Sequence, residues 1–283
     1  MTNPVLKAPA AGAADRRMSR IGRFYARRAK LSWQPLAVLV ALIGAWYLAA
    51  QFYASQQLAF LVPFPHLVLG AAFADPLFSP QLLADLGNST GVALTGLAIA
   101  IVIGVGWATL MAQAKWVERS LYPYAVILQC IPILALVPLI GALFGYEFAS
   151  RVIVTVMISI FPLVSNTLFG LQSTQLAQRE LFALQGASRL TMLRKLQFPA
   201  ALPSIFVGLR NAAGLSVVGA IVSDQFFQRG TPGLGVLIMV STSRLNGPGT
   251  YAAILTASLL GVAVFLLFGW LGRLFVGKWY DFG

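Results

Sequence analysis

The chain has 283 residues, of which 58% are hydrophobic and only 10% are charged. Soluble domains average about 25% charged residues, so this composition excludes a soluble enzyme and predicts a membrane protein. The 20 Lys and Arg against 8 Asp and Glu give a net charge of +12, but the basic residues gather beside the apolar segments, which excludes a nucleic-acid-binding surface and indicates membrane topology.

Residues 1–30 form an Ala- and Arg-rich basic tail, which we expect on the cytoplasmic side. The apolar segment at about 33–53 is too long for the core of a signal peptide, so it is expected to remain as an anchor. Residues 55–87 are expected outside the cytoplasm, with a short amphipathic helix near Pro65 to Phe73. Residues 31–283 then form one membrane domain.

Long uncharged blocks divide the rest of the chain, and each can hold the roughly 20 apolar residues that a spanning helix needs. The sequence predicts an all-α, polytopic protein with spans at about 33–53, 89–113, 121–144, 151–174, 200–223 and 251–276. This arrangement puts both termini in the cytoplasm and leaves Arg151, Arg229 and Arg244 for the opposite face, as the positive-inside rule requires. At the start of the second span, Asn88-Ser89-Thr90 is expected to cap the helix.

Prolines interrupt the third and fourth predicted spans. Pro132 and Pro138 lie in the third and Pro162 in the fourth, and each removes a backbone hydrogen bond and bends its helix. Irregular backbone is tolerated in a membrane where it is buried or lines a cavity, so the third to fifth spans are expected to line a pathway. The polar candidates on them are Gln129, Ser159, Asn166 and Ser216. For each, an interhelical hydrogen bond is the alternative role.

The region between the fourth and fifth spans is polar and basic. Glu180 is expected in the first turn of a helix, with the cations of residues 189–195 towards its far end, an order that complements the helix dipole. Gly186 interrupts this helix where a bend or a close backbone approach is useful. Pro199 and Pro203 then mark a break before the chain re-enters apolar sequence. A helical loop of this kind outside the bilayer is suited to binding a partner.

The spacing in this region resembles the cytoplasmic coupling-loop signature of bacterial ABC-importer permeases. That signature is Glu-Ala-Ala, three residues, Gly, nine residues and an aliphatic-x-aliphatic-Pro ending, which Glu180, Gly186 and 196–199 match. Leu181 and Phe182 replace the two alanines, so the docking face is bulkier. The resemblance covers roughly residues 33–280 and extends to the branch that imports nitrate, sulfonates, taurine and pyrimidines. The landmarks similar to that branch are Pro63-Phe64-Pro65, Ile131-Pro132, Pro138-Leu139, Phe161-Pro162 and Gly233-Leu234-Gly235.

The resemblance implies a type I importer permease of the bacterial inner membrane, with its coupling loop at about 178–198. The implied partners are two ABC ATPase subunits, a second permease copy forming a homodimer, an extracytoplasmic solute-binding protein and membrane lipid. The solute is a nitrate-, sulfonate- or taurine-like anion, or a pyrimidine- or vitamin-like heterocycle. The residues expected to shape or contact the ATPase interface are Glu180, Leu181, Phe182, Leu184, Gly186, Ala187, Arg189, Arg194 and Pro199.

Two charges fall near the membrane interior. Arg210 lies about 16 Å along a helix from Pro199, and an ionisable residue at such a depth faces a cavity or a partner. It is expected to line the translocation path near an anionic solute, or else to snorkel or bond to carbonyls of a neighbouring helix. Asp224 is about 21 Å further along the same helix, too far to pair with Arg210. It is expected near the outer gate or at a docking site for the binding protein.

Catalytic and cofactor patterns are absent from the sequence. Residues 272–278 read G-x-x-x-x-G-K, but Trp279 stands where a phosphate-binding loop needs Ser or Thr, so ATP must be hydrolysed by another subunit. The only histidine is His66, and no metal-ligand cluster or nucleophile motif accompanies it. No cofactor is expected. The alternative function is a membrane scaffold or enzyme subunit whose basic loop binds a different partner.

Overall fold

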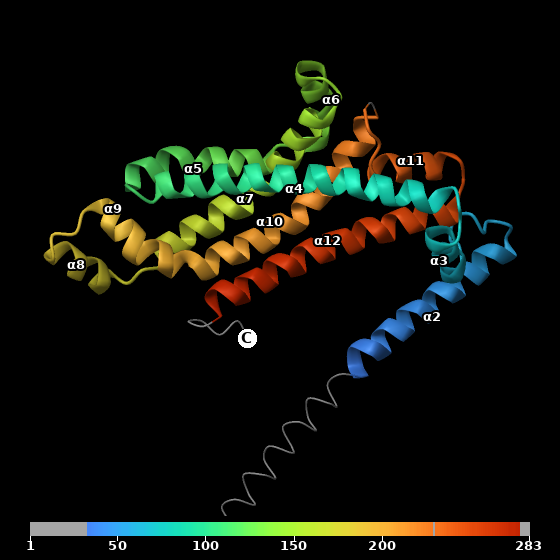
Figure 1. Ribbon diagram of the computed structural model, residues 1–283, viewed down its shortest axis with the longest axis horizontal. Coiled ribbons are helices and arrows are strands. Elements are labelled where there is room, and N and C mark those ends of the chain that lie inside the picture. The colour runs from blue at the N-terminus through green and yellow to red at the C-terminus, as the bar shows by residue number, and fades with distance from the viewer. Residues whose placement is uncertain (1–32, 229, 278–283) are drawn as a thin grey trace, which may run out of the picture. The chain divides into compact units, whose positions relative to one another are not determined.

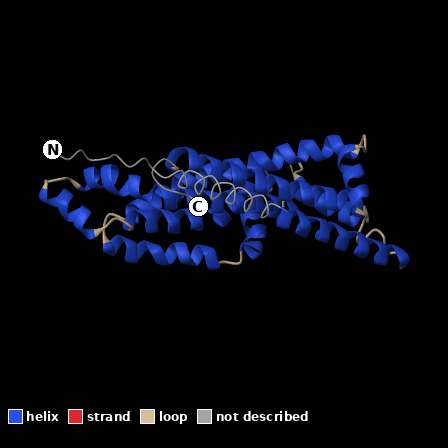
Figure 2. Ribbon diagram, turned by 90° about the horizontal axis from the view of Figure 1, so that it is seen from below, coloured by secondary structure: helices blue, strands red, loops and turns tan. Residues whose placement is uncertain are grey.

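The computed structural model describes residues 33–228 and 230–277, and the expected basic tail at 1–30 lies outside the described residues. The described chain is helical and contains no strand (Figure 2). It divides into two parts, residues 1–65 and 66–283, which are considered separately. The helices are α2 (Trp33–Ser55), α3 (Pro65–Phe73), α4 (Phe78–Met111), α5 (Lys115–Cys130), α6 (Ile133–Phe144), α7 (Phe148–Gln172), α8 (Leu176–Leu184), α9 (Arg189–Met192), the π-helical η1 (Leu193–Gln197), α10 (Phe198–Phe226), α11 (Leu234–Ser243) and α12 (Gly247–Val276).

The first part is α2 and the turn after it. The indole Nε1 of Trp46 donates a hydrogen bond of 3.1 Å to the carbonyl of Pro63, and the ring of Tyr47 lies 6.1 Å from that of Phe64. These contacts hold the turn against the last half of α2. With 23 residues, α2 is long enough to cross a bilayer.

The second part is built on α4, α7, α10 and α12, which run side by side (Figure 1). Glycines bring their backbones together: a Cβ on Gly208 would lie 2.9 Å from the Pro162 carbonyl oxygen, and one on Gly219 would lie 2.9 Å from the Thr155 Cα. Lipid offers no hydrophobic drive for helix association, so such small residues are what allow close van der Waals packing. The buried core of Val92, Leu97, Leu163, Leu171, Ala212 and Val217 lies between α4, α7 and α10.

Counted over the described residues, five helices are long and apolar enough to cross a membrane, and α5 and α6 together would make a sixth span. The predicted all-α, multi-span fold is therefore confirmed. The expected kink in the third span is a sharp one: α5 and α6 meet at 96° across Ile131 and Pro132. The Pro132 ring removes an amide donor where the helix breaks.

The predicted helix cap at the second span is wrong. Helix α4 begins at Phe78, not at residue 89, so Asn88-Ser89-Thr90 lies inside the helix and does not cap it. The cap is Asp75, whose carboxylate accepts hydrogen bonds from the amides of Phe78 (3.1 Å) and Leu77 (2.9 Å). These two bonds lower the pKa of Asp75 below its ordinary value.

The coupling region also differs from the prediction. The first turn of α8 contains no acid and Glu180 lies in its middle, while the basic residues 189–195 belong to α9 and η1, not to the far end of α8. The break falls at Gly186 and not at Pro199, because η1 passes directly into α10. Pro199 is the second residue of α10 and lies directly after the π-helical turn η1, so the chain stays helical through it.

Candidate functional site

Helix α8 presents a short apolar surface at one end of the second part. The side chain of Leu184 is 86% exposed and that of Leu181 is 54% exposed. Gly186 has φ +70°, a left-handed conformation that L side chains rarely adopt, and it ends α8 so that the chain can turn into α9. Ser188 then caps α9 by accepting a hydrogen bond from the amide of Thr191. The expected contact residues Leu181 and Leu184 thus lie on an exposed helix.

Arg179 fastens α8 to the end of α7. Its Nε donates to the hydroxyl of Thr174 (2.6 Å), and its terminal nitrogen donates to the carbonyls of Gln172 (3.0 Å) and Leu171 (3.3 Å). The side chain of Gln172 in turn donates to Glu118 of α5 (2.8 Å). Sequence reasoning missed Arg179, although its place directly before Glu180 and just after a span was a usable signal.

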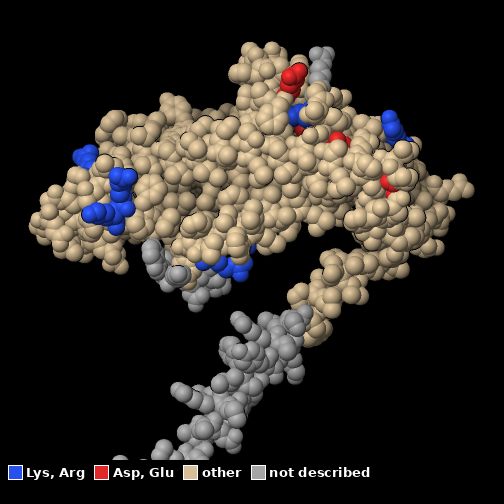
Figure 3. Space-filling view, in the orientation of Figure 1, with Lys and Arg blue, Asp and Glu red and all other residues tan. Residues whose placement is uncertain are grey.

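Charge is distributed unevenly over the face seen in Figure 3. Lys and Arg are visible at the end that carries α8 and α9 and also elsewhere on this face, including near α11, whereas the acidic side chains visible on it lie away from the α8 end. Arg189, Arg194 and Lys195 are exposed at the basic end. This end can therefore contact an acidic partner or anionic headgroups.

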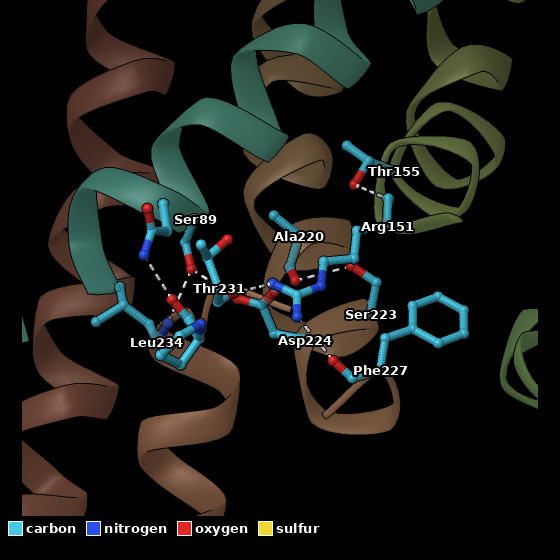
Figure 4. A network of polar contacts seen from close by, with 11 residues as sticks. Ser89, Arg151, Thr155, Ala220, Ser223, Asp224, Phe227, Thr231 and Leu234 are labelled. Atoms are coloured by element: carbon cyan, nitrogen blue, oxygen red, sulfur yellow. Dashed lines mark hydrogen bonds and ion pairs between the residues drawn. The ribbon is translucent and has the colours of Figure 1, made fainter. Parts of the chain in front are cut away.

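The opposite end holds a buried ion pair between Arg151 of α7 and Asp224 of α10, 3.0 Å apart (Figure 4). Arg151 also donates to the carbonyls of Thr231 (2.6 Å) and Phe227 (2.8 Å). Both side chains are almost completely buried, at 3% and 0% exposure. The pair therefore ties two spanning helices to the segment that follows α10.

Ser89 of α4 completes this network. Its hydroxyl donates to Asp224 (2.7 Å) and accepts from the amide of Leu234 (2.9 Å). A Cβ on Gly233 would overlap Asp224 and Ser89, and one on Gly235 would overlap the Ile221 carbonyl oxygen. Gly233 and Gly235 are thus required because the backbone at both positions lies too close to Asp224 and its neighbours for a side chain. Sequence reasoning placed Arg151 on the outer face but missed that Asp224, expected near the same level, was its partner.

Helix α6 packs against this network through Phe227. The Phe227 ring is fully buried, and the ring of Tyr146 meets it edge-on at 6.0 Å. Val137 and Ile140 of α6 pack in the same cluster as Phe227. A shift of α6 would therefore displace Phe227, whose backbone carbonyl accepts a hydrogen bond from Arg151.

The predicted pathway residues occupy different environments in the single chain. Ser159 and Ser216 are fully buried and donate to carbonyls of their own helices, those of Thr155 and Ala213. Asn166 is half-buried and donates to the Pro162 carbonyl in the same way. Gln129 and Arg210 are exposed, and Asp224 belongs to the buried network. The chain brings Asp224 and Arg151 together but does not bring Asp224 near Arg210.

Metal-binding geometry is lacking in the part of the chain that the structure describes, where no three His, Cys, Asp or Glu side chains could share an ion. The exposed helix α8 lies at one end, the buried Arg151–Asp224 ion pair lies at the other, and long apolar helices connect the two ends. It is suited to transmitting movement from a partner to a membrane bundle.

Comparison with known protein families shows which family this sequence matches. Residues 100–277 match the family described as binding-protein-dependent transport system inner membrane component. That span includes the bent pair, the coupling region and the ion pair.

Individual relatives are similar over most of the chain. The formylaminopyrimidine transport permease protein of Halalkalibacterium halodurans is 34% identical over 241 residues, 84% of this chain and 93% of the relative. The riboflavin transport system permease protein of Chloroflexus aurantiacus is 33% identical over 221 residues, 78% of this chain and 81% of the relative. The nitrate import permease protein of Synechocystis is 31% identical over 158 residues, 56% of this chain and 55% of the relative.

Proposed function

The chain belongs to the family of binding-protein-dependent transport system inner membrane components, and from this membership we propose how its parts carry solute. It is a multi-pass inner-membrane permease subunit of an ABC importer. Permeases of this class work with separate ATPase subunits and with solute-binding proteins, and ATP hydrolysis is not their own activity. The scaffold or enzyme alternative is not favoured.

The ATPase docks on α8 in this proposal. The observation that carries it is the exposed apolar face of α8, which Gly186 ends in a left-handed turn. Leu181, Phe182, Leu184 and Ala187 supply the apolar contacts, and Arg189 and Arg194 pair with acids of the ATPase. Arg179 makes α8 move together with α7, so closure of the ATPases is passed to the spanning helices.

Two copies of the chain enclose the pathway, each with its own ATPase. Six spans do not readily surround a channel, so a homodimer supplies the second wall. Gln129, Ser159, Asn166 and Ser216 line the pathway when the helices tilt, and Arg210 joins them only in the alternative in which the solute is an anion. The Arg151–Asp224 pair holds the outer segment at 227–235 in place, and Asp224 thereby acts in the outer gate. Both termini lie in the cytoplasm, which puts α8 on the ATPase side.

The solute is a small nitrogen heterocycle of the pyrimidine or flavin kind. Support comes from sequence identity: the formylaminopyrimidine and riboflavin permeases are 34% and 33% identical to this chain, whereas two aliphatic sulfonate permeases that align over 80% and 91% of it are 28% and 24% identical. A nitrate- or sulfonate-like anion is the second candidate, for which exposed Arg210 is the favouring observation.

The test is transport by the complete complex in proteoliposomes. The permease is co-expressed with its ATPase and solute-binding protein, and ATP-dependent uptake is measured for a formylaminopyrimidine, riboflavin, taurine and nitrate. Uptake of a heterocycle that requires the binding protein is expected. If only taurine or nitrate is taken up, the proposed solute class changes from a heterocycle to an anion. Failure of the ATPase to bind the permease would remove the proposed docking surface.

A further inference from the structure

Two arginines line one cavity between α10 and α12. Arg210 and Arg273 face a cavity of about 350 Å³ whose other walls are Phe206, Val207, Leu266, Phe268, Gly269 and Gly272. Among the residues that the structure describes, no acidic side chain lines it. The cavity is therefore cationic on one side and apolar or aromatic on the others.

The flat face of the Arg210 guanidinium group packs against an aromatic ring in this cavity. Its guanidinium carbon lies 4.0 Å from the centre of the Phe265 ring, a cation–π contact that leaves the N–H groups at the edge of the plane available. A Cβ on Gly269 would lie 3.4 Å from the Arg210 Nε, so glycine at this position leaves room for the guanidinium. Among residues 33–228 and 230–277, neither arginine side chain makes a hydrogen bond or ion pair with another group.

The cavity lies near the end of α12. Arg273 is in the last turn of that helix, and Gly269, beside Arg210, lies about two turns from the end at Val276. Long basic side chains at such depths reach towards the headgroup layer. Because α10 begins at the coupling region and α12 runs back towards it, this end is the one that carries α8.

The same two helices, with Ile238 of α11, form a larger, apolar groove. It has a volume of about 600 Å³ and includes Gly214 of α10 and Gly261 and Phe265 of α12. Phe265, on which Arg210 stacks, belongs to this groove. An occupant would meet apolar surface along its length and two guanidinium groups at one end.

We propose that Arg210 and Arg273 bind the phosphate of an anionic membrane phospholipid whose acyl chain lies in the α10–α12 groove. A guanidinium group matches phosphate oxygens with paired N–H donors. Basic pockets between spanning helices at the cytoplasmic side are suited to lipid headgroups. A free solute anion would need only the cations, whereas a phospholipid matches both the cations and the apolar groove. The assignment rests on the proposed heterocyclic solute, because an anionic solute would place Arg210 in the pathway.

The test measures lipid retention by the full-length permease, alone and with its ATPase, purified in a neutral detergent. Native mass spectrometry and thermal unfolding are followed with phosphatidylglycerol, phosphatidylcholine, diacylglycerol and inorganic phosphate. Phosphatidylglycerol is expected to bind and stabilise most. Arg210→Gln and Arg273→Gln are each expected to weaken its binding about fivefold, since one surface cation contributes a factor of that size. Arg210→Lys should retain part of the binding, and Arg244→Gln, an exposed arginine of the α11 C-cap, should retain all of it.

Other outcomes identify a different occupant. Unchanged phosphatidylglycerol binding in both glutamine variants would overturn the site. Equal stabilisation by inorganic phosphate, lost in those variants, would assign it to a free anion instead of a lipid. Phosphatidylglycerol binding that appears only in Asp281→Asn would assign the cavity to the side-chain carboxylate of Asp281. Cross-linking of the groove to a second copy, with no lipid bound, would assign it to the dimer interface.

Discussion

The Oδ1 atom of Asp224 on α10 lies 3.0 Å from a guanidinium nitrogen of Arg151 on α7, and this pair supports the backbone that follows α10. Three carbonyl or amide groups of the 227–234 segment bind Arg151 or Ser89. Burying two charges is costly, and the cost is offset only when both are paired and hydrogen-bonded. The outer segment therefore depends on the pair for its position.

Asp224→Asn is expected to lower the free energy of unfolding by about 3–5 kcal/mol, because it leaves the buried Arg151 charge without compensation. The double variant Arg151→Met with Asp224→Leu should recover most of this loss, since no charge then remains buried. Denaturation of the detergent-purified permease measures both. Ser89→Ala serves as the comparison, with an expected loss of about 1–3 kcal/mol from unpaired hydrogen bonds. The ion-pair argument would be wrong if Asp224→Asn were the milder change.

Gly235→Ala is expected to destabilise the chain by about 1–3 kcal/mol, because its Cβ would overlap the backbone carbonyl of Ile221. The matched control is Gly106→Ala on α4, where nothing lies within 4 Å of an added Cβ. That change should be neutral or stabilising by up to about 1 kcal/mol, because alanine favours a helix. Thermal midpoints of the two variants, measured side by side, would contradict the close approach if they shifted equally.

The spanning helices were predictable because charge exclusion and length decide them, but their ends were not. Residues 55–87 were expected before the second span, yet α4 already begins at Phe78, because proline is tolerated in a first turn, where Pro80 lies, and the Asp75 carboxylate binds the amides of Leu77 and Phe78. The Pro132 break agrees with the prediction from the proline, but proline alone does not decide a break, because α5, α6, α7 and α10 continue past Pro123, Pro138, Pro162 and Pro203. Pro199 likewise lies in a continuous helical run, directly after the π-helical η1.

The candidate sites also differ in whether the sequence could predict them. Gly186 and the apolar residues of α8 follow a local spacing, so the sequence indicated them. The Arg151–Asp224 pair and the Arg210–Arg273 cavity join different helices, and their partners depend on how α7, α10 and α12 pack. A local pattern contains no information on that packing.

Gly186→Val is expected to reduce solute uptake per ATP hydrolysed, because a β-branched residue at φ +70° costs roughly 1–2 kcal/mol and reorients the end of α8. Gly186→Asn should retain most transport, since asparagine tolerates the left-handed conformation. Proteoliposome assays of uptake and ATPase activity separate coupling from expression. Normal uptake by Gly186→Val would mean that the turn geometry does not matter to coupling.

Arg179→Met is expected to separate ATP hydrolysis from transport, because it removes two hydrogen bonds from α8 to the end of α7 and one to Thr174 just beyond it, while retaining an apolar stem. ATPase binding should persist while uptake falls severalfold. Thr174→Val, which removes one of the three acceptors, should give a smaller loss. The control is Arg244→Met, distant from α8, which should transport normally. Equal loss of ATPase binding and uptake would instead make Arg179 a docking residue.

Leu184→Ser is expected to weaken ATPase binding without destabilising the isolated permease. The side chain is 86% exposed, so replacing it changes few contacts within the chain, and surface changes of this kind usually alter stability by less than about 0.5 kcal/mol. An apolar anchor at an interface, by contrast, contributes more than about 1 kcal/mol when it is a binding hot spot. Co-purification with the ATPase and the thermal midpoint of the permease are measured on the same preparation. Leu176→Ser, on the first turn of α8 and 71% exposed, is the matched control. A Leu184 variant that lost stability but retained its ATPase would place this side chain in the fold of the permease and not in the interface.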